Sequence, residues 1–252
     1  MPETPDEAPP GGNGPGGLGD LAVRLSDLAR DLQGEDDVEQ TLLAIAAAAV
    51  STVPGAQHAS LSVVQRRREV HTRAWTDEAC VKVDRVQYDT GQGPCLDAMY
   101  EQRTISVPDM STEQRWPEFT RRTAELGVLS MLAFQLYVQQ DTLGALNLYS
   151  ADRNAFDADS EHVGLLFAAH AAVAMSGAQQ QEHLNQAVAA RDVIGQAKGI
   201  LMERHKLTAD QAFAVLTRAS QQTNTKLVDV AVALAGGGDL TRLGVRRAAG
   251  KG

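Results

Sequence analysis

Residues 190–204 read ARDVIGQAKGILMER, a stretch of helix-forming residues that holds two glycines one helical turn apart. Each of these glycines, Gly195 and Gly199, costs a helix interior about 1 kcal/mol relative to alanine. A helix that accepts this cost on neighbouring turns indicates that another backbone, or a ligand, approaches it closely. The stretch therefore predicts a helix with a contact surface at its glycines.

The basic side chains of this stretch gather on one side of the helix. At about 100° per residue, Arg191 and Lys198 lie on the same side as Met202, whereas Val193 and Ile200 lie opposite. The two cations suit a polyanionic partner, but exposed Arg and Lys also cover apolar neighbours with their aliphatic stems. Spacing alone leaves both interpretations open.

The helical pattern around this stretch is long. It runs over Asp157–Arg204, beyond the usual length of globular helices, as is typical of a coiled coil or a signalling connector. Because the pattern is apolar on two faces, we expect self-association through it or through the N-terminal helices. Two shorter helices follow. Thr208 and Gln211 form a capping box that opens the first, which ends near Gln222, and the second is expected over Lys226–Ala235.

The sequence pattern before residue 157 predicts short strands mixed with helices. Alternating or β-branched runs between turn residues predict strands over His58–Gln65, Val70–Trp75, Val81–Tyr88, Thr104–Val107, Val128–Tyr137 and Leu143–Tyr149. Helices are expected over Leu18–Gln33, after the acidic cluster 35–37, and over Cys95–Gln102. Because the strands do not alternate regularly with helices, they favour an antiparallel α+β sheet flanked by helices over a doubly wound one.

Composition and charge narrow the class of protein. With 43% hydrophobic and 22% charged residues, the chain has a globular composition. No apolar run approaches the roughly 18 residues of a membrane span and no signal peptide is recognisable, so we expect a cytoplasmic protein without a membrane partner. The net charge is -9, yet residues 178–252 hold ten basic and six acidic residues, a local charge of +4. This asymmetry suggests a polyanion as a partner.

Motifs that carry enzymatic chemistry are missing from the sequence. It holds no GxxxxGK[ST], HExxH, CxxC or GxSxG pattern and no pair of histidines at i, i+4. Cys80 and Cys95 are too few for a disulfide framework or a four-ligand zinc site. We therefore expect no catalytic residues, no metal and no cofactor.

Three motifs mark the C-terminal part of the chain. They are Arg-x-x-Ile-x-x-Ala-Lys-Gly-Ile-Leu-Met from Arg191, Ala-Phe-x-x-Leu from Ala212 and Leu-x-x-Val-Ala from Leu227. Over about residues 180–236 the sequence closely resembles the ANTAR family of RNA-binding antiterminator domains. The resemblance implies a long helix leading into a three-helix head, which binds paired stem-loops in nascent RNA and prevents a terminator from forming. It assigns RNA contacts to Arg191, Gln196, Lys198, Gly199, Met202, Arg218, Ser220 and Lys226, whereas Ile194, Ala197, Phe213 and Leu216 are expected in the core.

A second set of motifs lies within residues 36–176. It comprises Asp89–Ala98 (DTGQGPCLDA), Ile105–Met110, Trp116–Phe119 and Leu143–Tyr149. These segments resemble a GAF domain of the kind fused to ANTAR heads in actinobacteria. The resemblance implies an antiparallel sheet with helices on its faces, which binds a small molecule or serves only to dimerise. It does not identify the small molecule.

Candidate pocket residues in this part are Trp75, Cys95, Trp116, Met131 and Phe134. Cys95 follows Gly-Pro at a helix start, where the helix dipole favours a thiolate, although a small buried residue fits the same position. The two tryptophans suit either a pocket lining or core filling.

These observations predict a disordered tail over 1–17, a GAF-like sensory domain over 18–176, an ANTAR-like RNA-binding domain over 177–236 and a flexible basic tail over 237–252. We expect a homodimeric regulator that binds structured RNA in response to a signal and prevents transcription termination. The alternative is a DNA-binding transcription factor with a ligand- or redox-sensing N-terminal domain, because three short helices also describe a helix-turn-helix head.

Overall fold

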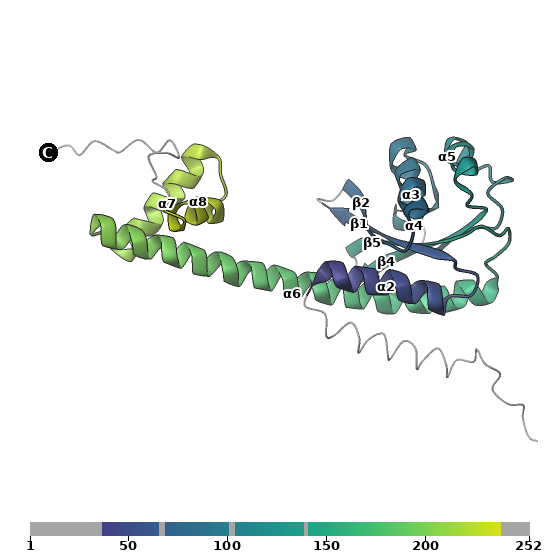
Figure 1. Ribbon diagram of the computed structural model, residues 1–252, viewed down its shortest axis with the longest axis horizontal. Helices are drawn as coiled ribbons and strands as arrows, with labels where there is room; N and C mark the ends of the chain where they lie inside the picture. Colours follow the sequence, from purple (N-terminus) through teal and green to yellow (C-terminus); the bar gives the residue numbers. More distant parts are fainter. Residues whose placement is uncertain (1–36, 66–68, 101–103, 139–140, 238–252) are drawn as a thin grey trace, which may run out of the picture. The chain divides into compact units, whose positions relative to one another are not determined.

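The computed structural model describes residues 37–65, 69–100, 104–138 and 141–237 (Figure 1). They fall into two compact units, which divide between Gln180 and Gln181. The predicted helix over 18–33, the predicted tail over 1–17 and all but Gly237 of the predicted tail over 237–252 lie outside the described residues. Within those ranges, none of the helices combines the length and the apolarity that a bilayer crossing requires.

The first unit is built on a five-stranded antiparallel sheet with the strand order β2-β1-β5-β4-β3. Its strands are β1 (His58–Gln65), β2 (Glu69–Trp75), β3 (Thr104–Val107), β4 (Ser130–Val138) and β5 (Asp141–Ser150). The predicted antiparallel α+β fold is confirmed, and β1 and β3 have their predicted bounds.

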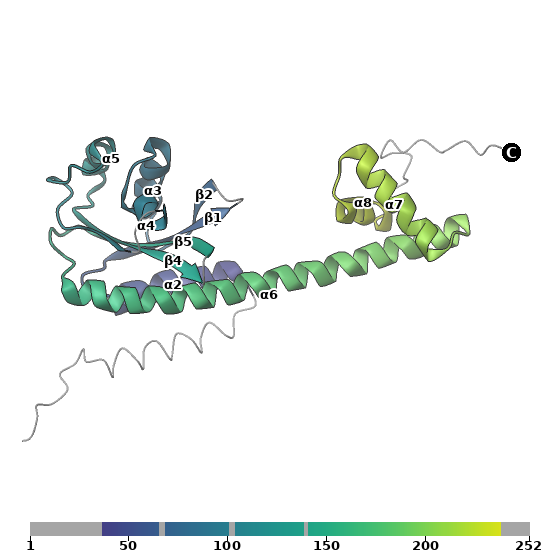
Figure 2. The same cartoon turned by 180° about the vertical axis from the view of Figure 1, so that it is seen from behind.

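Helices cover both faces of this sheet (Figures 1 and 2). One face carries α2 (Val38–Thr52) and the first part of α6 (Ala158–His205). The other carries α3 (Glu78–Thr90), α4 (Pro94–Tyr100) and α5 (Pro117–Thr123), which the sequence pattern does not predict and which continues into the 3₁₀ helix η1 (Ala124–Leu126). Alternate residues of each strand therefore enter two cores. Leu132 and Leu148 pack in the core with α2 and α6, whereas Met131 and Tyr149 pack in the core with α3 and α5.

The segment 81–88 is a helix, so its prediction as a strand is wrong. The Asp77 side chain accepts a hydrogen bond from the N–H of Ala79 and caps α3, and Gly91 ends the helix with a φ of 64°. The residues that α3 buries recur at intervals of three and four, which is the helical period: Cys80, Val83, Asp84 and Gln87. The alternating valines of VKVDRV suggested a strand, because short apolar patterns do not distinguish the two structures.

The second unit consists of the end of α6, α7 (Ala209–Thr223) and α8 (Leu227–Ala235). The predicted long helix is confirmed, since α6 has 48 residues. The capping box is confirmed as well: the Thr208 side chain accepts from the Gln211 N–H, and the Gln211 side chain accepts from the Thr208 N–H. Residues 181–189 of α6 are all exposed, and burial resumes at Ala197 and Leu201.

Candidate functional site

The core of the second unit leaves its one aromatic residue outside. Ala212, Leu216 and Ala219 of α7 are buried against Ala197 and Leu201 of α6, together with residues of α8. Phe213, the only aromatic residue in 181–252, is 44% exposed. The prediction that Phe213 belongs to the core is therefore wrong. The buried residues of α7 recur at i, i+4 and i+7, and Phe213 lies about 90° around the helix from their centre.

Phe213 lies beside one of the predicted RNA-binding residues. The Lys198 Nζ atom is 5.9 Å from the centroid of the Phe213 ring, within cation–π range. Arg191 is exposed two turns earlier on the same side of α6, and Met202, one turn after Lys198, is 37% exposed. These four residues, Arg191, Lys198, Met202 and Phe213, are referred to below as the α6–α7 strip.

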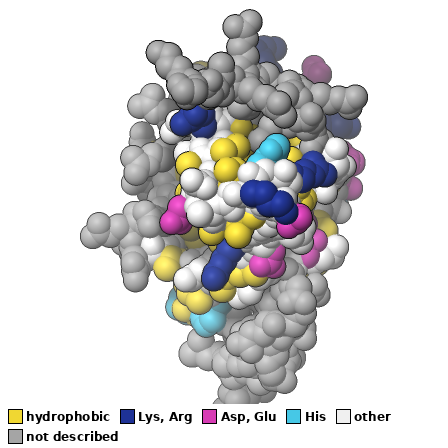
Figure 3. All heavy atoms as spheres, turned by 90° about the vertical axis from the view of Figure 1, so that its left-hand side faces the viewer, with side chains coloured by type: hydrophobic (Ala, Val, Ile, Leu, Met, Phe, Trp, Pro, Cys, Tyr) yellow, Lys and Arg dark blue, Asp and Glu magenta, His cyan; other side chains and the backbone are white. Residues whose placement is uncertain are grey.

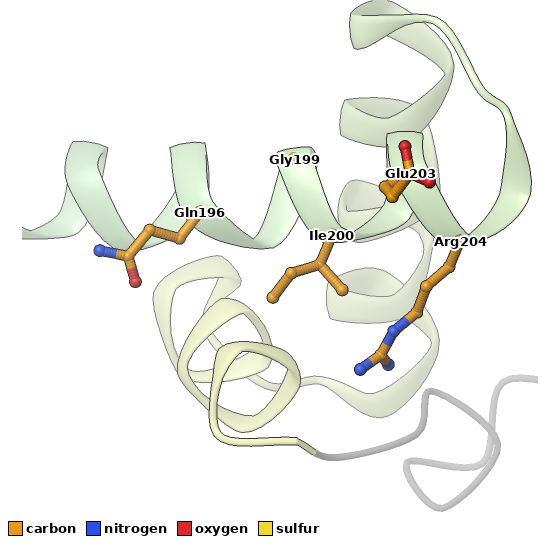
Figure 4. Close-up of a pocket in the computed structure, with 5 residues that line it drawn as sticks. All are labelled: Gln196, Gly199, Ile200, Glu203 and Arg204. Atoms are coloured by element: carbon orange, nitrogen blue, oxygen red, sulfur yellow. The ribbon is translucent and has the colours of Figure 1, made fainter.

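The other predicted residues of α6 lie on a different flank of the helix. Gln196 and Gly199 line an open hollow of about 560 Å³ together with Ile200, Glu203 and Arg204. Figure 4 shows Gln196, Ile200 and Arg204 extending to the same side of α6. The structure thus divides the predicted α6 residues between the strip and this hollow. Arg204 was missed because it lies after the last position of the family motif.

Gly195 and Gly199 of α6 have open space around them. A Cβ atom built on Gly195 or on Gly199 meets no other atom of the described part of the chain within 4 Å, the helix's own backbone aside. The close approach that the sequence indicates therefore does not come from packing within those residues.

The remaining predicted RNA-binding residues lie on or next to α7 and α8. Arg218 and Lys226 are exposed, and Arg218 lies about 140° around α7 from Phe213. Ser220 is half-buried, and its hydroxyl donates to the carbonyl of Thr225 at 2.6 Å, which ties the end of α7 to the turn before α8. Figure 3 shows several Lys and Arg side chains on one face, interspersed with hydrophobic and a few acidic ones.

The structure separates the five candidate pocket residues of the first unit. Trp116 and Met131 are buried in one cluster under α3 and α5, and Cys95 is buried in an adjoining cluster with Met99 and Ala145. Phe134 packs on the opposite face of the sheet against α6, and Trp75 is 38% exposed. Met131 and Phe134 are three positions apart on one strand, so their side chains point to opposite faces.

A buried polar cluster lies between the sheet and α3, and sequence reasoning missed it. The Asp84 carboxylate, on α3, accepts hydrogen bonds from Ser60, Thr72, Tyr149, Gln87 and Asn147 at 2.5–3.2 Å. The available signal was Ser60, Ser62 and Asn147, polar residues on strands whose two faces are both covered by helices.

Burial sets the protonation of the two thiols next to this cluster. It raises the pKa of Cys80 and of Cys95 to about 12 each, so both thiols stay protonated at neutral pH. Cys95 is fully buried, and its Sγ donates to the Ser62 hydroxyl at 3.3 Å. Burial and the raised pKa of Cys95 agree with its interpretation as a small buried residue. They argue against its interpretation as a thiolate stabilised by the helix dipole.

Two regions of the chain match known family models. Residues 35–176, more than half of the 252, match the GAF domain model. The chain belongs to the GAF domain family. Residues 182–234 match the ANTAR domain model, so the GAF domain precedes an ANTAR domain. No curated protein matches the chain.

Solved structures share the fold of the GAF domain. The GAF domain of a phosphoenolpyruvate-protein phosphotransferase from Coxiella burnetii is 17% identical with a TM-score of 0.51, and the match covers 65% of this chain and 96% of that one. A free methionine-R-sulfoxide reductase from Neisseria meningitidis, in complex with its substrate, is also 17% identical with a TM-score of 0.51, over 64% and 90% of the chains. The Stigmatella aurantiaca phytochrome photosensory core module is 9% identical with a TM-score of 0.56, over 85% and 45%. At these identities the likeness concerns the fold alone.

Proposed function

We propose that the protein is a cytoplasmic, signal-responsive RNA-binding regulator of the actinobacterial GAF–ANTAR type. In this proposal the sensory domain spans residues 18–176 and the RNA-binding domain 177–236, with tails at 1–17 and 237–252. The RNA-binding domain binds paired stem-loops in a nascent transcript and prevents transcription termination. A small molecule of unknown identity acts at the GAF domain.

The observation that carries the proposal is the α6–α7 strip within the ANTAR domain. Lys198 lies beside the exposed ring of Phe213, and Arg191 is exposed two turns earlier on the same side of α6. Cations that contact phosphates supply affinity for any nucleic acid. An exposed ring adds a surface on which an unpaired base can stack, and unpaired bases are what sequence-specific RNA readers bind.

The alternative of a DNA-binding head is less well supported. In a helix-turn-helix the second helix of the pair enters the major groove and reads base edges. Here α8 would take that place, and its sequence LVDVAVALA has no Lys or Arg and exposes Asp229 and Val232. Arg191 and Lys198 instead lie on one side of the long helix α6.

A regulatory role without catalysis fits the chemistry of the cysteines. Both thiols are buried, and their raised pKa values keep them protonated at neutral pH. A nucleophilic or redox-sensing cysteine needs an accessible thiolate. This argues against a redox function at Cys95.

Homodimerisation is proposed through one side of α6. Two large apolar side chains on the part of this helix that belongs to the second unit are more than half exposed: Leu184 at 58% and Val188 at 54%. They lie one helical turn apart and form an apolar stripe. A second copy of α6 packed on this apolar stripe would bring two ANTAR domains to one transcript, and paired binding raises affinity through effective concentration.

A competition experiment tests the function. The full chain is titrated with an RNA of two stem-loops, and then with duplex DNA of equal length and charge. The proposal expects the RNA to bind more tightly and Lys198→Ala to weaken RNA binding. Equal affinity for the duplex DNA would favour the DNA-binding alternative.

A further inference from the structure

The Asp84 carboxylate is buried without a compensating cation. It is 0% exposed, and the five groups that donate to it are hydroxyls and amides from β1, β2, β5 and α3 itself. A buried carboxylate is usually paired with a cation, because removing a charge from water is costly. Among the described residues, no Lys, Arg or His contacts Asp84 through a hydrogen bond or an ion pair.

The titratable groups that face Asp84 are all weak acids. They are Tyr149 from β5, Cys95 from α4, and Cys80 and Tyr88 from α3. The strands β1 and β2 contribute Ser60, Ser62 and Thr72, which do not titrate. The helix α5 buries Phe119 and Thr123 and keeps its charged residues at the surface, as does η1: Glu118, Arg121, Arg122 and Glu125.

Burial separates the pKa of Asp84 from those of its neighbours. It raises the pKa of Asp84 from 3.8 to about 6, and it raises the pKa values of Cys80 and Cys95 to about 12. The pKa values of Tyr88 and Tyr149 are also raised by burial. Within this cluster, Asp84 is therefore the group that changes charge between pH 5 and 8.

The cluster holds a spare acceptor for a proton on Asp84. Asn147 is fully buried, and its Oδ1 atom has no hydrogen-bond partner among the described residues, while its Nδ2 atom lies 3.2 Å from Asp84 Oδ1. A half-turn of this amide exchanges the two atoms and places an acceptor opposite Asp84. The ionised carboxylate needs donors around it, and the protonated one needs such an acceptor.

Gln87 joins Asp84 to the loop before α4. Its Nε2 atom donates to Asp84 Oδ1 at 3.2 Å, and its Oε1 atom accepts from the Cys95 N–H at 2.8 Å. Gly93, with a φ of 141°, packs so closely on the Gln87 side chain that a Cβ atom there would overlap it. A movement of the Gln87 side chain would therefore displace the loop 91–94 and the first turn of α4.

We propose that Asp84 is a proton-binding site of the GAF domain, and that Asn147 and Gln87 carry its protonation state to the loop 91–94 and α4. A proton from solvent binds Asp84 Oδ1, and the new O–H donates to the side-chain Oδ1 of Asn147 after its amide turns, which ends the bonds from Asn147 Nδ2 to Ser60 and Ser62. The protonated oxygen keeps one lone pair, which accepts from the nearer Tyr149 hydroxyl. Gln87 Nε2 therefore loses its acceptor, and the bond from the Cys95 N–H to Gln87 Oε1 changes. The GAF domain thereby responds to pH near 6, independently of whether the ANTAR domain binds RNA.

Trp116 reports on the α4 end of this path. Its Nε1 atom donates to Asp97 of α4 at 3.0 Å, and Trp75→Phe leaves it the only tryptophan. The full chain carrying Trp75→Phe is titrated from pH 5 to 8 by tryptophan fluorescence, and the Asp84 carboxyl carbon is followed by NMR. We expect one-proton transitions with a common midpoint near 6 in both signals.

Three variants separate binding of the proton from its transmission. Asp84→Asn should abolish both transitions, and Asp89→Asn, the same change at an exposed position of α3, should keep both. In Gln87→Met the NMR signal of the Asp84 carboxyl carbon should still titrate, whereas the Trp116 fluorescence should no longer change with pH. A carboxyl signal that stays flat from pH 5 to 8 overturns the proposal, even if Asp84→Asn does not fold. A Trp116 transition that persists in Asp84→Asn or in Gln87→Met overturns the proposed transmission.

Discussion

The ammonium group of Lys198 lies 5.9 Å from the centre of the exposed Phe213 ring, which joins α6 to α7 at the surface of the ANTAR domain. Nearly half of this apolar ring remains exposed after folding, so a partner could reach both the ring and the neighbouring cation. A stacked base would contact the ring while its phosphate meets the lysine. This pair therefore predicts how the domain holds an unpaired base.

Replacing the Phe213 ring should weaken RNA binding and leave the fold intact. Phe213→Leu keeps an apolar side chain but removes the stacking surface, which is worth about 1–3 kcal/mol per base. Phe213→Tyr keeps the ring and should bind like the parent. Affinity for stem-loop RNA is measured for all three proteins, with circular dichroism as the check of folding. If Phe213→Leu binds the RNA as tightly as Phe213→Tyr, the ring has no role in recognition.

Gly199→Ala should separate stability from binding. Because a Cβ atom at Gly199 meets open space, the change should stabilise α6 by about 1 kcal/mol through helix propensity alone. The same methyl group occupies the hollow shared with Gln196 and Arg204, so RNA affinity should fall. Thermal unfolding and RNA titration of the two proteins check this. A more stable variant with unchanged RNA affinity would show that nothing approaches this glycine.

Asp84 should make the GAF domain less stable as the pH rises. The folded pKa of about 6 is above the unfolded value of 3.8, so the stabilisation is complete below about pH 4 and is lost as the pH rises through 6. The shift of about two pKa units corresponds to roughly 3 kcal/mol. The free energy of unfolding of the parent and of Asp84→Asn, measured with denaturant between pH 4 and 8, gives this contribution. Parallel stability curves for the two proteins would contradict the prediction.

A charge in the apolar stripe of α6 should prevent dimerisation. Leu184→Glu places carboxylates from two copies against each other, whereas Ala189→Glu adds the same exposed charge on the opposite side of the helix. Because association depends on concentration, sedimentation is measured at roughly tens of micromolar, with and without RNA. Leu184→Glu should be a monomer, whereas the parent and Ala189→Glu should be dimers. A parent protein that is monomeric under both conditions would exclude the proposed dimer.

The sequence predicts those parts of the fold whose signals are local. The strands β1 and β3 follow from alternation and from the turn residues around them, and the Thr208 capping box marks the start of α7. The helix α3 was mistaken for a strand because VKVDRV alternates over too few residues to distinguish the two periods. Its cap at Asp77 was the stronger signal.

The candidate sites were harder to predict, because they depend on contacts between distant segments. Asp84 meets Ser60 and Tyr149, which lie 24 and 65 residues away in the sequence. Phe213 fits a core pattern by its residue type, and only the packing of α7 through its alanines and Leu216 leaves it at the surface.

The central claim, that the α6–α7 strip contacts RNA phosphates, is tested most directly by the salt dependence of RNA binding. Stem-loop RNA is titrated at several salt concentrations into the parent, Arg191→Ala and Lys198→Ala. If each side chain neutralises one phosphate, each variant should reduce the slope of log affinity against log salt by about 0.7–0.9. Folded variants that bind the RNA with the parent's affinity and slope would place the RNA-binding surface elsewhere and contradict the claim.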